Sequence, residues 1–265
     1  MNIHVLVENH GNTEFEGEHG LSLFLEIGEL KVLFDTGQSS LFIKNAVKMG
    51  IDVNSAHFVV LSHGHYDHGN GLDYLIDKEL VCHVGSFVDR YRKKDNAPIG
   101  LPLSLQEAQK RFTLRLSSAP MELHPNVYFM GEIDRKYTFE TPAAFSYLDG
   151  GSDDPILDDS AIVIKTELGN VIITGCSHSG ICNIVRQAIF ITGDVRTYAV
   201  FGGFHLKDVN EQVKQTVKVL EDSGVKYIYP VHCTSQEVVD TLRLQLPHVV
   251  VQGVTAGQSL TITTR

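Results

Sequence analysis

Hydrophobic and polar positions alternate along the first half of the chain in patterns that predict strands followed by a helix. Residues 2–8 alternate apolar and polar side chains, and residues 21–27 and 31–34 form two similar runs around a short polar turn. This period of two is typical of strands, and the short turn predicts a hairpin. Residues 39–49 instead place their apolar side chains at helical spacing and end before a glycine. A strand, helix and strand in succession indicate an α/β fold.

The second half of the chain repeats this arrangement after a less regular middle segment. Asp208, followed three residues later by Glu211, resembles a capping box at the start of one helix. The elements expected in this half are strands at 160–166, 171–174, 197–201, 226–229, 249–251 and 259–262, and helices at 180–192, 208–223 and 235–246.

The middle segment, residues 86–141, contains prolines and only short apolar runs, such as 112–116 and 127–130. Because neither period persists there, we expect an insertion that caps the active site. The whole chain, residues 1–265, is expected to form one domain, a size that α/β folds reach without splitting.

Composition narrows the range of partners. The 265 residues include 22 Lys and Arg against 32 Asp and Glu, a formal net charge of −10, which argues against nucleic acid as the main partner. The one basic cluster, residues 90–94, is interpreted as a solvated helix end, with phosphate binding as the alternative. No apolar run approaches the ~18 residues of a membrane span, so no membrane association is expected. Four cysteines without the spacing of a disulfide framework suit a reducing cytoplasm.

The candidate metal-binding side chains lie together directly after the apolar run of residues 59–61. His63, His65, Asp67 and His68 follow within six residues, and a helix is expected from Asp67 to residue 76. Histidines scattered through a chain are usually surface or core residues. Three histidines and an aspartate at the end of one strand instead predict a loop that holds metal, with room for two ions.

This His-x-His-x-Asp-His segment resembles the signature of the metallo-β-lactamase superfamily, and the resemblance covers nearly the whole chain. With Glu18-His19-Gly20-Leu21-Ser22 it is similar to the branch related to a dihydropterin–aminobenzene phosphate synthase. The resemblance implies a four-layer αββα sandwich. The other segments in the family's order are Asp35-Thr36-Gly37, Thr174-Gly175-Cys176-Ser177-His178, Gly202-Gly203-Phe204-His205-Leu206 and Pro230-Val231-His232-Cys233-Thr234.

The resemblance also implies which residues bind metal. Two divalent transition-metal ions are expected, zinc before iron or manganese, although carboxylate and imidazole ligands suit all three. Three neutral imidazoles leave a coordination position open for water, as a catalytic ion requires. The ligands implied are His63, His65 and His178 for one ion, and Asp67, His68 and His232 for the other.

Four further residues keep alternative interpretations. Cys176 stands where many relatives carry the aspartate of Thr-Gly-Asp; it either binds metal or is a buried thiol, and the later Asp194 is interpreted as a turn residue. Asp35 either orients a ligand histidine or caps a helix. His19 lies near the substrate or simply in a loop. We expect His205 to handle substrate or protons, with packing or direct metal ligation as its alternatives.

Three functions follow from the resemblance. Our first hypothesis is a hydrolase in which water activated by the metals attacks an ester, amide or phosphoester. The alternative is a transferase that joins a dihydropterin pyrophosphate to a ribofuranosylaminobenzene phosphate. A non-hydrolytic di-iron redox module is the third, although such proteins carry an extra acid where Gly64 stands here. The expected partner is a small-molecule substrate, phosphorylated or a pterin in the transferase reading.

Overall fold

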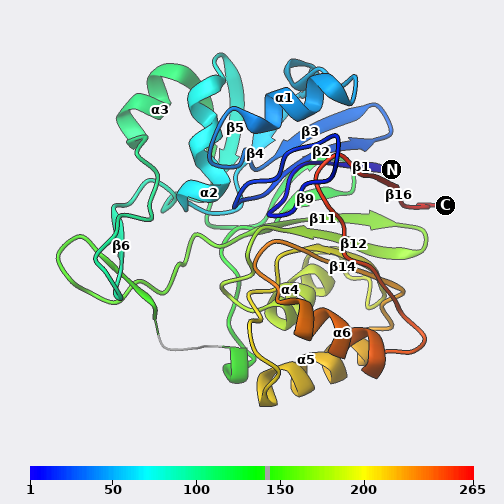
Figure 1. The fold of residues 1–265 in the computed structure, drawn as a ribbon. Helices are drawn as coiled ribbons and strands as arrows, with labels where there is room; N and C mark the ends of the chain where they lie inside the picture. The colour runs from blue at the N-terminus through cyan, green and yellow to red at the C-terminus, as the bar shows by residue number, and fades with distance from the viewer. Residues whose placement is uncertain (141–143) are drawn as a thin grey trace. The chain divides into compact units, whose positions relative to one another are not determined.

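The computed structural model describes residues 1–140 and 144–265, which form two compact units (Figure 1). The first unit contains residues 1–118, 144–158 and 255–263 of the described chain, and the second contains residues 119–140, 159–254 and 264–265. Each unit has one seven-stranded sheet of its own. Each sheet can therefore be treated together with the helices that pack on it.

The sheet of the first unit changes from antiparallel to parallel across its width. Its strand order is β16-β1-β2-β3-β4-β5-β7, antiparallel from β16 to β3 and parallel from β3 to β7. The strands are β1 (Asn2–Val7), β2 (Ser22–Ile27), β3 (Leu30–Phe34), β4 (Phe58–Val60), β5 (Lys78–Cys82), β7 (Phe112–Leu116) and β16 (Ser259–Thr261).

Short helices cover one face of this sheet because their apolar side chains share its core. Phe42 of α1 (Leu41–Lys48) and Ala108 of α3 (Leu105–Arg111) pack in one cluster with strand residues such as Val59. Burial of a side chain of this size stabilises the fold by roughly 1.5–3 kcal/mol. The remaining elements of the unit are η1 (Val53–Ser55), α2 (Tyr66–Gly69), η2 (Asn70–Tyr74) and a two-stranded sheet of β6 (Arg90–Arg92) and β10 (Ser146–Leu148).

The helix expected over residues 67–76 is shorter than predicted. It forms one α-helical turn, α2, followed by the 3-10 segment η2. The α-helical turn passes into η2 at Gly69, which has φ −125° and ψ −9°. The result is a compact turn directly after the histidine-rich loop.

The sheet of the second unit has the order β15-β14-β13-β12-β11-β9-β8 and is parallel from β12 to β15. The predicted hairpin and the strands that follow it are confirmed. All six residues of β12 are buried, and the apolar run at 171–173 forms the centre of the strand. The strands are β8 (Met121–His124), β9 (Val127–Phe129), β11 (Ala161–Thr166), β12 (Gly169–Thr174), β13 (Thr197–Gly202), β14 (Tyr227–Pro230) and β15 (Val250–Val251).

Three long helices pack on this second sheet. They are α4 (Ile181–Thr192), α5 (Glu211–Asp222) and α6 (Gln236–Gln245), and a 3-10 turn, η3 (Thr138–Glu140), precedes them in the chain. The capping box predicted at Asp208 is wrong: α5 begins at Glu211, and the side chain of Asn210 accepts the hydrogen bond from Val213 N. Either residue type can cap a helix, so the sequence alone left two starting points.

The segment expected to be an insertion contributes strands to both sheets. Within residues 86–141, β7 joins the first sheet, and β8 and β9 form the edge of the second. Short edge strands flanked by prolines give a weak sequence signal, which explains the difference. A capping role for the rest of this segment stays a prediction, and residue 141 lies outside the described residues.

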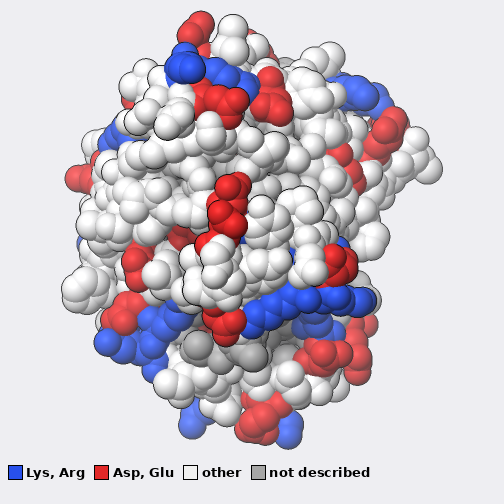
Figure 2. All heavy atoms as spheres, turned by 90° about the vertical axis from the view of Figure 1, so that its left-hand side faces the viewer, with Lys and Arg blue, Asp and Glu red and all other residues white. Residues whose placement is uncertain are grey.

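Surface charges of both signs are interspersed on the face shown in Figure 2. Within the basic cluster of residues 90–94, Arg92 pairs with Asp95 at 2.7 Å and Lys93 pairs with Asp153 at 2.6 Å. The acids therefore offset much of the positive charge of this cluster. Across the part of the chain that is described, no helix combines the length and apolarity needed to cross a membrane.

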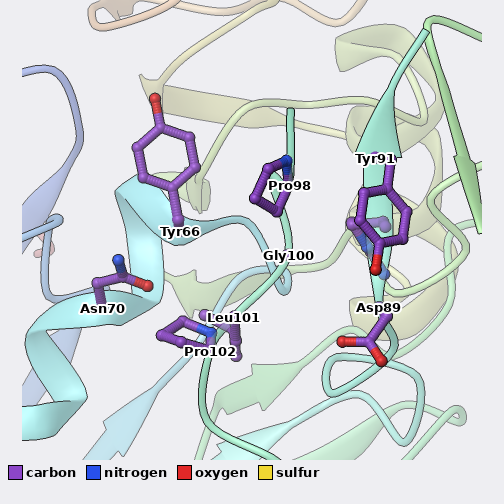
Figure 3. A pocket seen from close by; sticks show the side chains of 9 residues that line it. Tyr66, Asn70, Asp89, Tyr91, Pro98, Gly100, Leu101 and Pro102 are labelled. Atoms are coloured by element: carbon purple, nitrogen blue, oxygen red, sulfur yellow. The ribbon is translucent and has the colours of Figure 1, made fainter. Parts of the chain in front are cut away.

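The first unit also contains a pocket of about 330 Å³ beside α2 (Figure 3). Its wall includes Tyr66 and Asn70, which come directly from the histidine-rich segment. Pockets of this size suit small organic ligands. The remaining lining residues are Asp89, Arg90, Tyr91, Pro98, Gly100, Leu101 and Pro102.

Candidate metal-binding residues

The first group of ligand-type residues follows β4 in the first unit. His63 and His68 are completely buried, and His65 and Asp67 are 5% and 6% exposed. Because β3 and β4 are parallel, their carboxyl ends lie at the same edge of the sheet, which brings Asp35, just after β3, beside this loop. The predicted cluster of three imidazoles and one carboxylate is therefore present on one short segment.

Asp35 holds this loop in place through three contacts. Its Oδ1 accepts a hydrogen bond from Ser62 N at 2.7 Å, and its Oδ2 accepts one from Ser62 Oγ at 2.7 Å. The same Oδ2 lies 2.7 Å from His68 Nδ1. A carboxylate on one ring nitrogen fixes the ring and leaves the other nitrogen available to a metal. These contacts are those expected of an orienting residue rather than of a helix cap.

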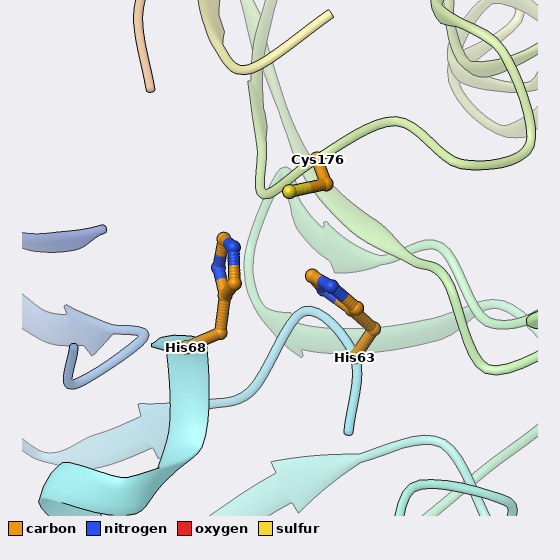
Figure 4. A group of neighbouring side chains, drawn as sticks. All are labelled: His63, His68 and Cys176. Carbon is orange, nitrogen blue, oxygen red and sulfur yellow. The ribbon is translucent and has the colours of Figure 1, made fainter. Parts of the chain in front are cut away.

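The rings on the loop lie close together. His63 Nε2 is 2.9 Å from His65 Nδ1, and the ring centroids of His63 and His68 are 4.3 Å apart. Figure 4 shows the side chains of His63 and His68 projecting from this segment. Clustered imidazoles without intervening apolar side chains are the arrangement that a metal ion uses.

His19 approaches the same loop from the N-terminal segment. Its Nε2 lies 3.1 Å from Asp67 Oδ2, and its side chain is 55% exposed. The preceding Glu18 anchors the segment, since its carboxylate accepts hydrogen bonds from Ser39 N at 3.2 Å and from Ser39 Oγ at 2.6 Å. His19 is therefore placed to meet both solvent and Asp67, and its position near the substrate stays a prediction.

Sequence reasoning missed Asp158. Its Oδ2 accepts a hydrogen bond from Gly64 N at 2.7 Å, and its Oδ1 accepts one from Arg90 Nη2 at 2.9 Å. A Cβ on Gly64 would lie 1.9 Å from Ser86 O, so only glycine fits there. The signal available in the sequence was the acidic run ending at Asp159, which resembles an ordinary polar turn.

The second unit presents its ligand-type residues on three loops. Because β12, β13 and β14 are parallel neighbours, the loops that follow them lie at one sheet edge. Main-chain and thiol contacts join these loops: Gly203 N donates to Gly175 O at 2.8 Å, and His205 N donates to Cys233 Sγ at 3.2 Å. A Cβ on Gly203 would approach Cys233 Sγ to 2.5 Å, so this contact requires a glycine.

Within this unit, Cys176, His232 and Cys233 form a group that could hold a metal. Each offers one ligand atom, and these atoms lie within 4.8 Å of one another. Thiolate and imidazole ligands together suit zinc. His178 and His205 lie beside each other, with ring centroids 4.5 Å apart. The predicted residues Cys176, His178, His205 and His232 thus all lie on the three loops at this edge.

The backbone around two of these histidines adopts an uncommon conformation. His205 and His232 have φ values of 50° and 54°, in the left-handed region that non-glycine residues seldom occupy. Such conformations persist where the surroundings impose them, and they gather at functional sites. The uncommon backbone conformation of the loops after β13 and β14 therefore sets the positions of these two side chains.

Two aspartates of the second unit have different roles. Asp159 is buried and accepts hydrogen bonds from Ser179 N at 2.8 Å and from Ser179 Oγ. Burial raises the pKa of Asp159 to about 6, although these hydrogen bonds oppose the shift. Asp194 follows α4 and pairs with Arg196 at 2.7 Å, which lowers its pKa to about 2. Asp194 is thus a turn residue, as predicted.

Comparisons with known proteins agree with this geometry. Residues 16–232 match the model of the metallo-beta-lactamase superfamily, so the chain belongs to that superfamily. A solved structure described as a metal-dependent hydrolase of the beta-lactamase superfamily has a TM-score of 0.88 at 31% identity, covering 99% of both chains. The predicted α/β fold class is confirmed: two large sheets are each flanked by helices.

Two relatives come from Methanocaldococcus jannaschii. A 7,8-dihydropterin-6-methyl-4-(beta-D-ribofuranosyl)-aminobenzene-5'-phosphate synthase is 34% identical, covering 88% of this chain and 87% of its own length. An uncharacterized protein is 31% identical, covering 91% of this chain and 93% of its own length. The predicted resemblance, to the superfamily and to the synthase branch within it, is confirmed.

Proposed function

We propose that this protein is a metal-dependent hydrolase with a binuclear centre. The observation that carries the proposal is the 63–68 loop, where four buried ligand-type side chains gather and Asp35 orients one of them. In this proposal His63, His65 and His178 bind one ion, and Asp67, His68 and His232 bind the second. Cys176 is a further ligand candidate on the second ion, because its sulfur lies near His232.

The donor set is chemically suited to divalent transition metals, with zinc expected first. Bound metals would lower the pKa of a water molecule to ~7 and polarise the bond to be cleaved. The protein's own residues supply the rest. Asp35 and Asp158 hold the loop that carries four of the ligands. His205, half-buried on its left-handed turn, donates a proton to the leaving group.

A transferase is the second candidate. The synthase that is 34% identical to this chain favours it, because the similarity extends over most of both proteins. In that reaction the same residues would hold a dihydropterin pyrophosphate while an aminobenzene displaces the pyrophosphate. The ester, amide and phosphoester substrates of the first candidate require no second organic substrate, so the two reactions can be separated by assay.

The di-iron redox alternative has less support. It expects an additional acidic ligand at position 64, whereas any side chain there would meet Ser86 O. A carboxylate could enter only if the backbone of the loop moved. An iron-oxo protein absorbs visible light and a zinc protein does not, so the colour of the purified protein tests this alternative directly.

The deciding experiment is elemental analysis of protein purified without chelator, followed by a substrate panel. We expect about two transition-metal equivalents per chain and loss of turnover after chelation. The panel contains phosphoesters, lactones, and a dihydropterin pyrophosphate supplied with an aminobenzene. Full activity with one equivalent or none would contradict the binuclear centre, and product formed only when both organic substrates are present would identify the transferase.

A further inference from the structure

Two cysteines from distant parts of the chain meet at the edge of the second sheet. Cys176 follows β12 and Cys233 follows β14, 57 positions later in the sequence. Their Sγ atoms lie within 4.8 Å of each other, and Cys233 Sγ lies 3.5 Å from Cys176 O. A disulfide joins its sulfurs at about 2.05 Å, so these two atoms have less than about 3 Å to close. A change of χ1 rotamer moves a sulfur by a distance of this order, so the thiols can meet while the sheet stays intact.

Main-chain hydrogen bonds hold the loops that carry these two cysteines. Gly203 N donates to Gly175 O at 2.8 Å, and Val231 N donates to Gly202 O at 3.0 Å. A Cβ on Gly203 would lie 2.5 Å from Cys233 Sγ and 3.4 Å from Cys176 Cα, so a side chain at this position would press against both cysteines. Two thiols that are held side by side in this way react as an intramolecular pair, at a high effective concentration.

The other two cysteines have different surroundings. Cys82 and Cys182 are buried in the apolar cores of the first and the second unit. Burial raises the pKa of the Cys82 thiol to about 12 and also raises the pKa of the Cys182 thiol. Both therefore stay protonated at neutral pH, and only a thiolate attacks an oxidant. Cys233 is half-buried, which leaves it accessible to a small oxidant.

We propose that Cys176 and Cys233 form a reversible disulfide when the protein meets a hydroperoxide, whereas Cys82 and Cys182 remain thiols. The sulfur of Cys233 attacks the peroxide, the O–O bond breaks, and a sulfenic acid forms while the alcohol or water leaves with the thiol proton. The sulfur of Cys176 then displaces hydroxide from Cys233 Sγ, which leaves as water with the second thiol proton. The two thiols give two electrons to the peroxide, and a dithiol reverses the reaction by exchange.

This inference goes beyond the proposed function and does not rest on it, because the disulfide needs only the two thiols. In the proposed centre, Cys176 is a ligand candidate on the second ion and His232 is adjacent to Cys233. A disulfide would withdraw both sulfurs from metal, and a bound metal would in turn shield them from the oxidant. The test is therefore made on protein from which metal has been removed by a chelator.

The full-length, chelator-treated protein is exposed to about one equivalent of hydrogen peroxide, and the remaining thiols are alkylated after denaturation. We expect two of the four cysteines to escape alkylation, and a dithiol to make all four reactive again. Peptide mapping should place the bond between Cys176 and Cys233. The extent of reaction should not change with protein concentration, because both thiols belong to one chain.

Cys182→Ala is the matched control, because Cys182 lies in the same unit and only six positions after Cys176. This variant should still lose two thiols to the disulfide. Cys176→Ser should form no disulfide within the chain, and its sulfenic acid on Cys233 should be trapped by dimedone. Cys233→Ser should give neither a disulfide nor a dimedone adduct. Circular dichroism checks the fold of each variant, and the peptide map of the wild type decides by itself where a variant does not fold.

Four thiols that all survive the peroxide would overturn the proposal. A bond that includes Cys82 or Cys182, or one that forms only between two chains, would do the same. So would a disulfide within the chain of Cys176→Ser or Cys233→Ser, a dimedone adduct in Cys233→Ser, or a folded Cys182→Ala protein that forms no disulfide. Metal content does not enter any of these outcomes, so failure of the proposed metal centre would leave the disulfide standing.

Discussion

The two units present ligand-type residues in opposite ways. In the first unit, three histidines and an aspartate lie within six residues of one loop after one strand. In the second unit they lie on loops after three strands, and Cys176 and Cys233 are 57 residues apart in the chain although their loops are in contact. Local sequence thus sets the first arrangement, and the parallel order of β12, β13 and β14 sets the second.

The supports behind the ligands differ in the same way. The first loop is held by carboxylates from far along the chain, Asp35 and Asp158, and Asp158 is compensated by Arg90. The second set relies on bonds between neighbouring loops, such as His205 N to Cys233 Sγ at 3.2 Å. Substitutions in the first loop should therefore remove both negative charge and bound metal. In the loops of the second unit, some substitutions should lower turnover while the metal content stays the same.

The largest effect is expected for Asp67→Asn, because the amide keeps the shape of the side chain but loses its charge. Turnover should fall by more than the ~10–100-fold typical of losing a residue behind the ligands, and about one metal equivalent should be lost. Activity assays, elemental analysis and circular dichroism measure this, and the dichroism spectrum should not change.

Asp73→Asn is the control for this variant, since Asp73 lies on the adjoining η2 but pairs with Arg111 at 2.9 Å. It should retain wild-type metal content and turnover. If Asp67→Asn kept its activity, Asp67 would not belong to the site. Substitutions in the first loop would then not differ from those in the second unit in their effect on metal content.

His205→Ala tests the second unit, where we assign a residue to proton transfer rather than to metal binding. Turnover should fall by about 100-fold, the scale of lost acid–base assistance, while metal content stays the same. Its ring lies 4.5 Å from that of His178, so the pH dependence of the residual activity should also change. Loss of one metal equivalent would make His205 a ligand, and unchanged kinetics would make it a packing residue.

Most of the elements and the first ligand loop could be predicted from the sequence, because their signals are local. Alternation and helical spacing gave the hairpins and α4, and the run from His63 to His68 needs no distant partner to be noticed. The helix expected over 67–76 and the cap at Asp208 were wrong because the end of a helix and the choice between competing caps are decided by tertiary contacts. The strands of the middle segment were not assigned, although the apolar runs 112–116 and 127–130 coincide with β7 and β9, because neither period persists around these runs.

The supporting residues could not be predicted, because their partners are remote. Asp158 accepts a hydrogen bond from Gly64 N, 94 positions away in the sequence, and the acidic turn around Asp158 contains no pattern that predicts this contact. The pocket residues Asn70 and Asp89 belong to different segments and share no motif. The ligands of the second unit depended on family resemblance, since single histidines after separate strands carry little information by themselves.

The smallest effect is expected for Asp194→Ala, which tests a Thr-Gly-Asp that local sequence alone would assign to the metal site. Asp194 accepts hydrogen bonds from Arg196 N and Arg196 Nε, both at 3.0 Å, so it closes a turn after α4. Metal content and turnover should equal those of the wild type. The free energy of unfolding should fall by less than about 1 kcal/mol, because Arg196 is largely exposed.

The pH dependence of this small effect has a definite direction. The pKa of Asp194 is lowered to about 2 in the folded protein, from 3.8, by Arg196. The stabilisation that Asp194 contributes is therefore complete above its unfolded-state pKa of 3.8. It is lost as the pH falls toward its folded-state pKa of about 2. Denaturant titrations should show the difference between wild type and variant shrinking over that interval. A metal loss in Asp194→Ala would instead place this turn in the site, and ligands in the second unit would no longer follow the ends of its parallel strands.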